Sequence, residues 1–274
     1  WSIVETEKGW LSYAVKGEQG CVSYLDIDEI RLHNGFIWDS LTIVASGQST
    51  PRIFGLSAST AKELSADITH RVKSHIVGLL QNQKPALLEV MNRIQILMDE
   101  KRYLANADIR RWTRDIPNIS ATLANPFFSA DDLPHELQTL IRPFMELIDP
   151  NSRKLKARNE AFVEWALDHY DGLFSKLEKY PLTGEQRRAA VVNEDRNLLI
   201  AAAGSGKSST IVAKAAYLIE SGLANASEIL VLTYNKDAQT EIDERLNKLK
   251  GTVSNYKQSV KAKTFHSLGI ETIA

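Results

Sequence analysis

Short apolar runs separated by turn-forming residues occupy the first fifth of the chain. The runs mix aromatic and β-branched side chains, and they lie at residues 3–4, 10–15, 21–25, 36–38, 41–44 and 53–54. Turn formers stand between them, and Asn34-Gly35 is the strongest short hairpin signal in this part of the chain. This spacing predicts an antiparallel sheet or small barrel over residues 1 to about 56.

The hydrophobic pattern becomes helical after this part. Apolar residues recur every three or four positions from Ala61 to Leu80, and Thr60 with Glu63 has the spacing of a capping box. A small β-sheet closed by one amphipathic C-terminal helix resembles a pleckstrin-homology-like domain. We therefore expect residues 1–80 to form a β-rich accessory domain closed by a helix.

Residues 81–180 have the pattern of packed helices. One apolar stripe runs from Leu87 to Met98 and another from Leu155 to Leu177. Between the two stripes, prolines at positions 117, 126, 134 and 143 break the pattern into short pieces. Such stripes are typical of helices that pack against one another, so we expect a helical segment here.

From Leu182 onward the pattern alternates between strands and helices. Apolar runs predict strands at 198–202, 229–233 and 260–264, with helices at about 206–221 and up to about 249. Alternation with short connections predicts a parallel sheet with right-handed crossovers. The expected fold is therefore an α+β N-terminal part followed by an α/β domain over residues 181–274.

The clearest chemical motif lies between the first of these strands and its helix. Residues 201–208 read Ala-Ala-Ala-Gly-Ser-Gly-Lys-Ser, the ending of a phosphate-binding loop, although Ala201 stands where the strict pattern has glycine. We call this segment the glycine loop. Its two glycines let backbone N–H groups converge on phosphates, and the helix N-terminus adds free donors. We expect Lys207 to reach the β- and γ-phosphates of ATP and Ser208 to complete the shell of a Mg²⁺ ion.

Three segments together resemble the superfamily 1A DNA helicases of the UvrD/Rep type, most closely the bacterial helicase IV family. Residues 182–191 resemble the adenine-reading element, with Thr183 in place of the usual Asn and Gln186 retained, whose amide offers adenine a donor and an acceptor. In the glycine loop, Ala202 stands where the family usually has glycine. The expected nucleotide site comprises Gln186, Ala201, Ala202, Ala203, Gly204, Ser205, Gly206, Lys207, Ser208 and Ser209.

The third segment consists of two elements that the family uses on single-stranded DNA. Residues 233–236 and 264–268 resemble these elements, and aromatic side chains at strand ends can stack on bases of any sequence. Between them, six basic residues and no acidic one lie from Arg245 to Lys263, which favours a phosphate-backbone track. The expected DNA contacts are Tyr234, Asn235, Lys236, Lys257, Lys261, Lys263, Phe265 and His266.

The resemblance implies the N-terminal portion of an ATP-dependent DNA helicase of 3′-to-5′ polarity, with a P-loop NTPase (RecA-like) partial domain. The implied ligands are ATP, Mg²⁺ and single-stranded DNA, and the implied partners are other proteins of DNA metabolism and repair. Two alternatives stay open: a helicase-like ATPase that acts on RNA polymerase, and an accessory protein- or DNA-binding module attached to a motor. The sequence contains no apolar strand ending in Asp-Glu and no second nucleotide-facing domain, so we expect these residues alone to be inactive.

Composition adds limits to this interpretation. Basic and acidic residues number 33 and 34, a net charge of −1, so a local patch must hold any nucleic acid. Cys21 is the single cysteine, which excludes disulfides within the chain and cysteine-based zinc sites and fits a cytoplasmic protein. No apolar run of about 18 residues occurs, so no membrane partner is expected. The start at Trp1 and the end at Ala274 suggest a piece of a longer protein.

Overall fold

The computed structural model describes residues 2–7, 9–149, 151–202, 204–254, 256 and 259–273. Two residues of the expected sites, Ala203 and Lys257, lie outside these described residues. The chain divides into two compact units: unit 1 comprises Trp1–Asp99 with Asp108–Ser152, and unit 2 comprises Glu100–Ala107 with Arg153–Ala274. The helical segment expected over 81–180 therefore contributes to both units.

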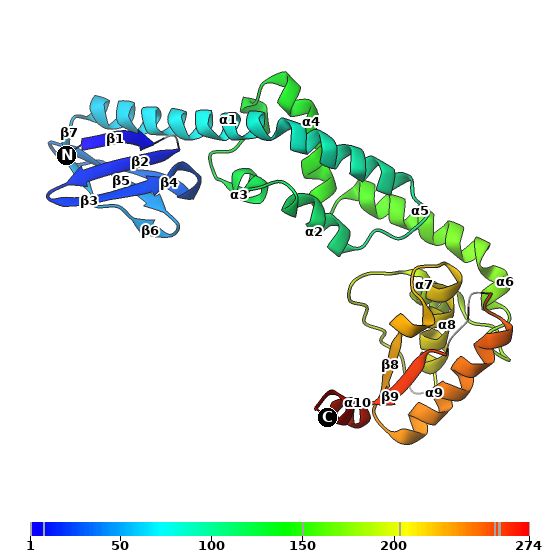
Figure 1. Cartoon of the computed structure of the whole chain (residues 1–274). Helices are drawn as coiled ribbons and strands as arrows, with labels where there is room; N and C mark the ends of the chain where they lie inside the picture. Colours follow the sequence, from blue (N-terminus) through cyan, green and yellow to red (C-terminus); the bar gives the residue numbers. More distant parts are fainter. Residues whose placement is uncertain are drawn as a thin grey trace. The chain divides into compact units, whose positions relative to one another are not determined.

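Unit 1 begins with two antiparallel sheets, as the spacing of its apolar runs predicts (Figure 1). The first sheet contains β1 (Ser2–Glu7), β2 (Trp10–Val15) and β3 (Glu18–Ser23). The second contains β4 (Ile27–His33), β5 (Asp39–Ala45), β6 (Gln48–Ser49) and β7 (Ile53–Leu56), with β7 paired to β5. A two-residue turn at Lys16-Gly17 joins β2 to β3, and its φ values of 51° and 86° match the type I′ geometry that suits a twisted hairpin.

Residues 36–38 form a loop and not the strand that their apolar run suggests. Strands β4 and β5 stay paired only as far as His33 and Ser40, and the hairpin closes through residues 34–38. The Gly35 amide donates to Asp39 Oδ1 at 3.0 Å, and a Cβ on Gly35 would lie 1.9 Å from the Trp38 carbonyl oxygen. The turn signal at Asn34-Gly35 is thus confirmed in position, while the apolar residues after it stay unpaired in the loop.

One long helix, α1 (Ala58–Asp99), replaces the two helices expected before and after residue 80. It begins after Ser57, whose hydroxyl accepts from the Thr60 amide at 3.1 Å, so the cap lies three residues before the expected one. The helix continues through Pro85 because its buried stripe keeps one phase on both sides of the proline, and this stripe packs on the second sheet and on α4 (His135–Ile148) (Figure 1). The stripe consists of Ala61, Ile68, Val72, Ile76, Leu80, Leu87, Val90 and Ile94.

Shorter helical elements complete both units. Before α4 come α2 (Asn106–Arg114), α3 (Ile119–Ala124) and the 3₁₀ turn η2 (Ala130–Asp132). The helices of unit 2 are α5 (Arg153–His169), α6 (Asp171–Phe174), α7 (Gly184–Val191), α8 (Lys207–Glu220), α9 (Lys236–Lys248) and α10 (Phe265–Ile273). Among the described residues, no helix combines the length and the apolar character that crossing a bilayer requires.

Unit 2 contains a parallel strand pair, β8 (Leu230–Thr233) and β9 (Lys261–Thr264), as the strand–helix alternation predicts. Helix α8 lies at the centre of the unit's core because it is apolar on two sides. Val212 and Ile219 pack with residues of α9, β8 and β9, whereas Ala213 and Tyr217 pack with residues of α5 and α7. The glycine loop leads directly into this helix, so a well-packed element fixes its position.

Residues 198–202 do not form the strand that their apolar run predicts. Leu198 and Ile200 are 85% and 86% exposed, and no strand in the described part of the chain pairs with this segment. A strand exists only where a neighbour takes up its backbone hydrogen bonds. The described parallel sheet therefore comprises β8 and β9, and the expectation of a strand at 198–202 is wrong for this structure.

Candidate functional site

The glycine loop adopts a backbone that only glycine adopts without strain. Gly204 and Gly206 have φ values of 75° and 84°, in the left-handed region, and Gly206 is the N-cap of α8. Ser205 closes the turn, with its amide and its hydroxyl both donating to the Ala202 carbonyl, at 3.3 and 2.7 Å. The two glycines thus place the free N–H groups of the α8 N-terminus beside the loop.

Lys207 folds back over the loop. Its ammonium donates to the carbonyl oxygens of Ala201, at 3.0 Å, and Ala202, at 2.7 Å, and the side chain remains exposed. Carbonyl oxygens are weaker partners for an ammonium than phosphate oxygens, because phosphate carries a negative charge that adds Coulomb attraction to the hydrogen bond. An anion at the α8 N-terminus would therefore compete for this side chain. Ser208 and Ser209 follow in the first turn of α8.

Gln186 connects α7 to the glycine loop. Its Oε1 accepts from the Thr183 amide at 2.9 Å, completing a capping box, and its Nε2 donates to the Ser205 carbonyl at 2.9 Å. A Cβ on Gly206 would lie 2.4 Å from this Nε2, so the contact leaves no room for a larger residue there. Recognition of adenine by Gln186 stays a prediction. Binding of the base would replace at least one of the hydrogen bonds to Thr183 and Ser205 with a hydrogen bond to adenine.

Arg245 joins α9 to the start of α8. Its guanidinium donates to Ser209 Oγ at 2.8 Å and pairs with Glu178 at 3.1 Å and with Glu241 at 2.8 Å. Arg245 is the first residue of the basic track expected from the sequence. In the structure its guanidinium is instead bound to these partners within unit 2. Its partner Glu178 lies 67 positions away, and only the Glu241 spacing of four residues is visible in the sequence.

The two expected DNA elements meet at one edge of the parallel strand pair. Thr233 and Thr264 are opposite each other in the β8–β9 register, so Tyr234 and Phe265 both follow strand ends on the same side. Tyr234 is 93% exposed and Phe265 is 63% exposed, which excludes both rings from the core. Figure 1 shows β8 and β9 side by side, with α10 beginning at this edge.

The polar residues of this edge have different environments. Lys236 and His266 follow the strand ends and are exposed, as a contact to phosphate requires, whereas the exposed Lys261 lies at the opposite end of β9. Asn235 Oδ1 accepts from the Ala238 amide at 2.8 Å as the N-cap of α9, and Lys263 forms an ion pair with Glu271. The structure thus brings together the aromatic residues and part of the basic set, and gives Asn235 and Lys263 partners within the unit.

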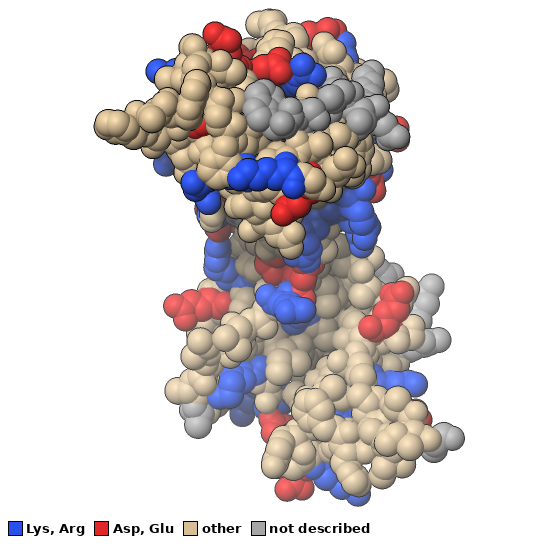
Figure 2. Space-filling view, turned by 90° about the vertical axis from the view of Figure 1, so that its left-hand side faces the viewer, with Lys and Arg blue, Asp and Glu red and all other residues tan. Residues whose placement is uncertain are grey.

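Basic and acidic side chains are interspersed on the face drawn in Figure 2, and wide neutral areas lie between them. This agrees with a net charge of −1 for the chain. This face therefore offers no large basic surface that would attract a polyanion at long range.

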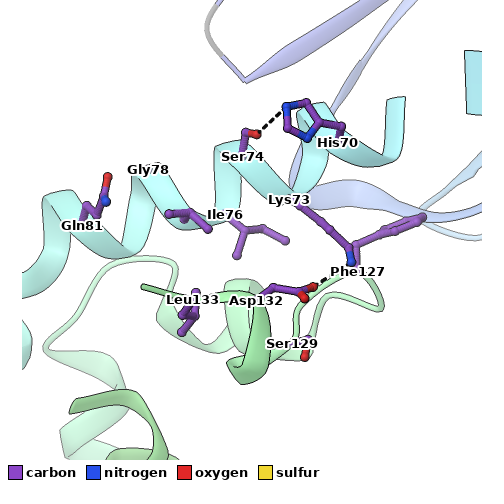
Figure 3. A pocket seen from close by; sticks show the side chains of 11 residues that line it. His70, Lys73, Ser74, Ile76, Gly78, Gln81, Phe127, Ser129, Asp132 and Leu133 are labelled. Carbon is purple, nitrogen blue, oxygen red and sulfur yellow. Dashed lines mark hydrogen bonds and ion pairs between the residues drawn. The ribbon is translucent and has the colours of Figure 1, made fainter. Parts of the chain in front are cut away.

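Unit 1 also contains a cavity of about 370 Å³ between α1 and residues 127–133 (Figure 3). Lys73 Nζ lies 2.7 Å from Asp132 Oδ2, and His70 Nε2 lies 3.5 Å from Ser74 Oγ. The charged groups of the wall pair with each other, and Ile76 and Leu133 supply apolar surface. The cavity thus lies where an ion pair and apolar contacts connect η2 to α1. None of the expected site residues lines it.

Lys214 on α8 is a titratable group that the sequence pattern does not reveal. It lines a hollow of about 650 Å³ whose other walls include Leu199 and Leu230, and its Nζ donates to the Val192 carbonyl at 2.5 Å. Burial disfavours the ammonium form and lowers the pKa of Lys214 from 10.5 to about 8.

We expect Lys214→Met to raise the free energy of unfolding near pH 7. Between pH 8 and 10.5 the unfolded chain holds a proton that the folded chain lacks, so wild-type stability rises with pH in this window. Below pH 8 the folded wild type carries the full free-energy cost of burying the Lys214 ammonium. Replacing this side chain with methionine removes roughly 2–3 kcal/mol of that cost from the free energy of the folded state. Urea unfolding from pH 7 to 10.5 measures this difference, and the exposed-site variant Lys248→Met serves as control. A difference that stays constant over this range would contradict the assignment.

Comparisons with known proteins agree with the resemblance drawn from the sequence. DNA helicase IV of Escherichia coli (strain K12) is 25% identical over 244 residues, which are 89% of this chain and 35% of that protein. ATP-dependent DNA helicase UvrD1 of Mycobacterium leprae (strain TN) is 41% identical over 83 residues, 30% of this chain and 10% of the relative. A probable DNA helicase II homolog of Mycoplasma capricolum is 40% identical over 87 residues, 31% of this chain and 12% of the relative.

The chain therefore spans about a third or less of the length of these relatives. No solved structure matches it. Residues 182–274, which hold the glycine loop and the β8–β9 edge, match the model of the UvrD/REP helicase N-terminal domain. Residues 1–140 match the model described as DNA helicase IV / RNA helicase N terminal. Since this second match covers half of the chain, the chain belongs to the DNA helicase IV / RNA helicase N-terminal family.

Proposed function

We propose that the chain is the N-terminal portion of an ATP-dependent DNA helicase that moves 3′ to 5′ on single-stranded DNA. The observation that carries this proposal is the exposed pair Tyr234 and Phe265, which lie at the ends of neighbouring parallel strands. Side chains in this arrangement can stack on successive bases without reading sequence. The glycine loop in the same unit, with two left-handed glycines before α8, supports a nucleotide site.

In this proposal each residue of the nucleotide site has a distinct task. Lys207 exchanges its loop carbonyls for the β- and γ-phosphates of ATP, and the Ser208 hydroxyl joins the shell of the Mg²⁺ ion. Gln186 reads adenine, and because the same amide holds the Ser205 carbonyl, a bound base would alter the loop. Arg245 keeps Ser209 in place and does not contact the nucleotide.

The finer fold assignments are part of the same proposal. Unit 2 would be the first part of a RecA-like domain, with β8 and β9 as part of its parallel sheet. The seven strands of unit 1, arranged in two antiparallel sheets and followed by α1, support a pleckstrin-homology-like domain.

We expect Phe265→Ala to weaken binding of an oligothymidylate by about 1–3 kcal/mol, or about 5- to 150-fold, with little dependence on base sequence. The ring is exposed, so its loss should leave the melting temperature almost unchanged. Fluorescence anisotropy measures the affinity. Tyr180→Ala removes another exposed ring of unit 2, from the segment between α6 and α7, and is the matched control.

Two results would contradict the DNA assignment of this edge. A melting temperature lowered by several degrees with normal DNA affinity would make Phe265 a structural residue. Binding to RNA polymerase that depends on Phe265, without measurable affinity for single strands, would favour the alternative of an ATPase that acts on polymerase.

The 274 residues alone are expected to give no DNA-stimulated ATP turnover. Phosphoryl transfer depends on positioning and charge stabilisation, and the sequence contains no apolar strand ending in Asp-Glu to orient the Mg²⁺ ion and the attacking water. A phosphate-release assay on rigorously purified protein tests this. Turnover that disappears in the Lys207→Ala variant would show that the present residues suffice.

A further inference from the structure

Unit 1 carries a cluster of exposed rings that the proposed motor function does not use. Phe36 and Ile37 protrude from the β4–β5 loop, Trp38 at its end is 61% exposed, and Phe54 on β7 is 49% exposed. Single exposed apolar residues are common, but a group of large ones on one surface typically marks a binding site. The Gly35–Asp39 hydrogen bond, at 3.0 Å, shapes the loop that presents them.

The strand register places the rings at the same end of the second sheet. Asp39 pairs with Leu56 and Leu41 pairs with Ile53, so Phe54 lies between these two pairs. Trp38 directly precedes Asp39, and the loop residues therefore adjoin the outer end of β7. We call this surface the aromatic edge of unit 1, and it comprises Lys16, His33, Phe36, Trp38, Arg52 and Phe54.

Cations accompany the rings. Lys16 Nζ lies 4.7 Å from the centroid of the Phe54 ring, and the Arg52 guanidinium lies 5.7 Å from the same centroid. Arg52 also approaches His33 Nδ1 at 3.5 Å. Lys16 lies in the type I′ turn between β2 and β3, and from this hairpin tip its ammonium reaches Phe54 on β7. Both cations are exposed, so their remaining N–H donors face solvent.

This combination of groups fits one class of ligand best. A lipid surface would take up the protruding loop residues but not Phe54, because two charged groups lie against its ring. An apolar protein groove would leave the ammonium and guanidinium groups without acceptors. A nucleic acid strand provides partners for both the rings and the cations, since its bases stack on rings and its phosphates accept hydrogen bonds from Lys and Arg.

We propose that the aromatic edge of unit 1 is a second binding site for single-stranded nucleic acid, with Phe36 and Trp38 stacking on bases and Lys16 and Arg52 contacting phosphates. The site uses no residue of the glycine loop or of the β8–β9 edge. It goes beyond the proposed motor function and would exist even if that function were wrong.

The test measures binding of the whole chain to a fluorescent oligothymidylate of about 16 nucleotides. Binding at the β8–β9 edge is first removed with Tyr234→Ala and Phe265→Ala, so that the remaining affinity reports on unit 1. Adding Phe36→Ala and Trp38→Ala is expected to lower this affinity about fivefold or more. The matched control adds Leu88→Ala and Ile96→Ala, which remove exposed apolar side chains from α1 and should change nothing.

A second measurement separates stacking from charge. Arg52→Ala should reduce the slope of log affinity against log salt by about 0.7, the value for one lost phosphate contact on a single strand. Unchanged affinity in the Phe36/Trp38 variant overturns the proposal. So does unchanged DNA affinity combined with lost binding to phosphatidylcholine–phosphatidylglycerol vesicles, which would assign the edge to membranes. If the Tyr234/Phe265 variant binds as the wild type does, the β8–β9 edge is contradicted, and a loss of binding on adding Phe36→Ala and Trp38→Ala then supports the site on unit 1.

Discussion

Replacing Lys207 with alanine is expected to weaken Mg²⁺-ATP binding about 100-fold or more, which corresponds to about 3 kcal/mol. Lys207 is the only cation in the glycine loop, and a triphosphate bound without it would have uncompensated charge beside the α8 N-terminus. In the structure the ammonium contacts only exposed loop carbonyls, so its removal takes nothing from the core. Calorimetric titration with Mg²⁺-ATP measures the affinity, and circular dichroism monitors the fold.

Lys248→Ala is the matched control for this variant. It removes the same charge from the exposed end of α9, outside the loop, and should leave the ATP affinity unchanged. Equal affinities for wild type and Lys207→Ala, with identical circular dichroism spectra, would contradict the nucleotide site. Equal losses in both lysine variants would point to a general charge effect instead.

Gly206→Ala is expected to damage the same site by a different route. A residue with a Cβ at a φ of 84° is strained by roughly 1–2 kcal/mol, and here the Cβ would also lie 2.4 Å from Gln186 Nε2. The loop can accept the methyl group only if the Gln186–Ser205 contact breaks. We therefore expect ATP binding to fall by about tenfold or more together with a measurable loss of stability.

Gly204 provides the control within the same loop. It has a similar φ of 75°, but a Cβ there meets nothing within 4 Å, so Gly204→Ala has the strain without the collision. The double variant Gly206→Ala with Gln186→Ala should recover the part of the stability loss that the collision causes. Identical effects of the two single glycine variants would show that the Gln186 contact has no influence on the loop.

The elements that the sequence predicts correctly depend on interactions between residues close together in the chain. Local signals located the β-rich start, the turn at Asn34-Gly35, the helix after the glycine loop and the parallel strands β8 and β9. Each of these follows from periodicity or from a residue that a tight turn requires. The sequence also places Tyr234 and Phe265 after strand ends, and the parallel pairing of β8 with β9 brings these ends to the same edge.

The elements that the sequence does not predict depend on partners far away in the chain. The apolar runs at 36–38 and 198–202 resemble strands, but a strand forms only against a neighbour. The break expected near residue 80 is absent because the stripe of α1 packs in phase on both sides of Pro85. Contacts such as Arg245–Glu178 and Gln186–Ser205 join positions far apart in sequence, and no local pattern contains them.

Helix α1 has a mechanical consequence for unit 1. Its 42 residues rise about 1.5 Å each, so it forms one continuous helix about 63 Å long that runs through Pro85. The second sheet packs against one end of α1, and α4 packs beside this helix farther along (Figure 1). A force applied to the sheet would therefore be transmitted along the helix to α4. A flexible linker between the sheet and α4 would instead absorb this force.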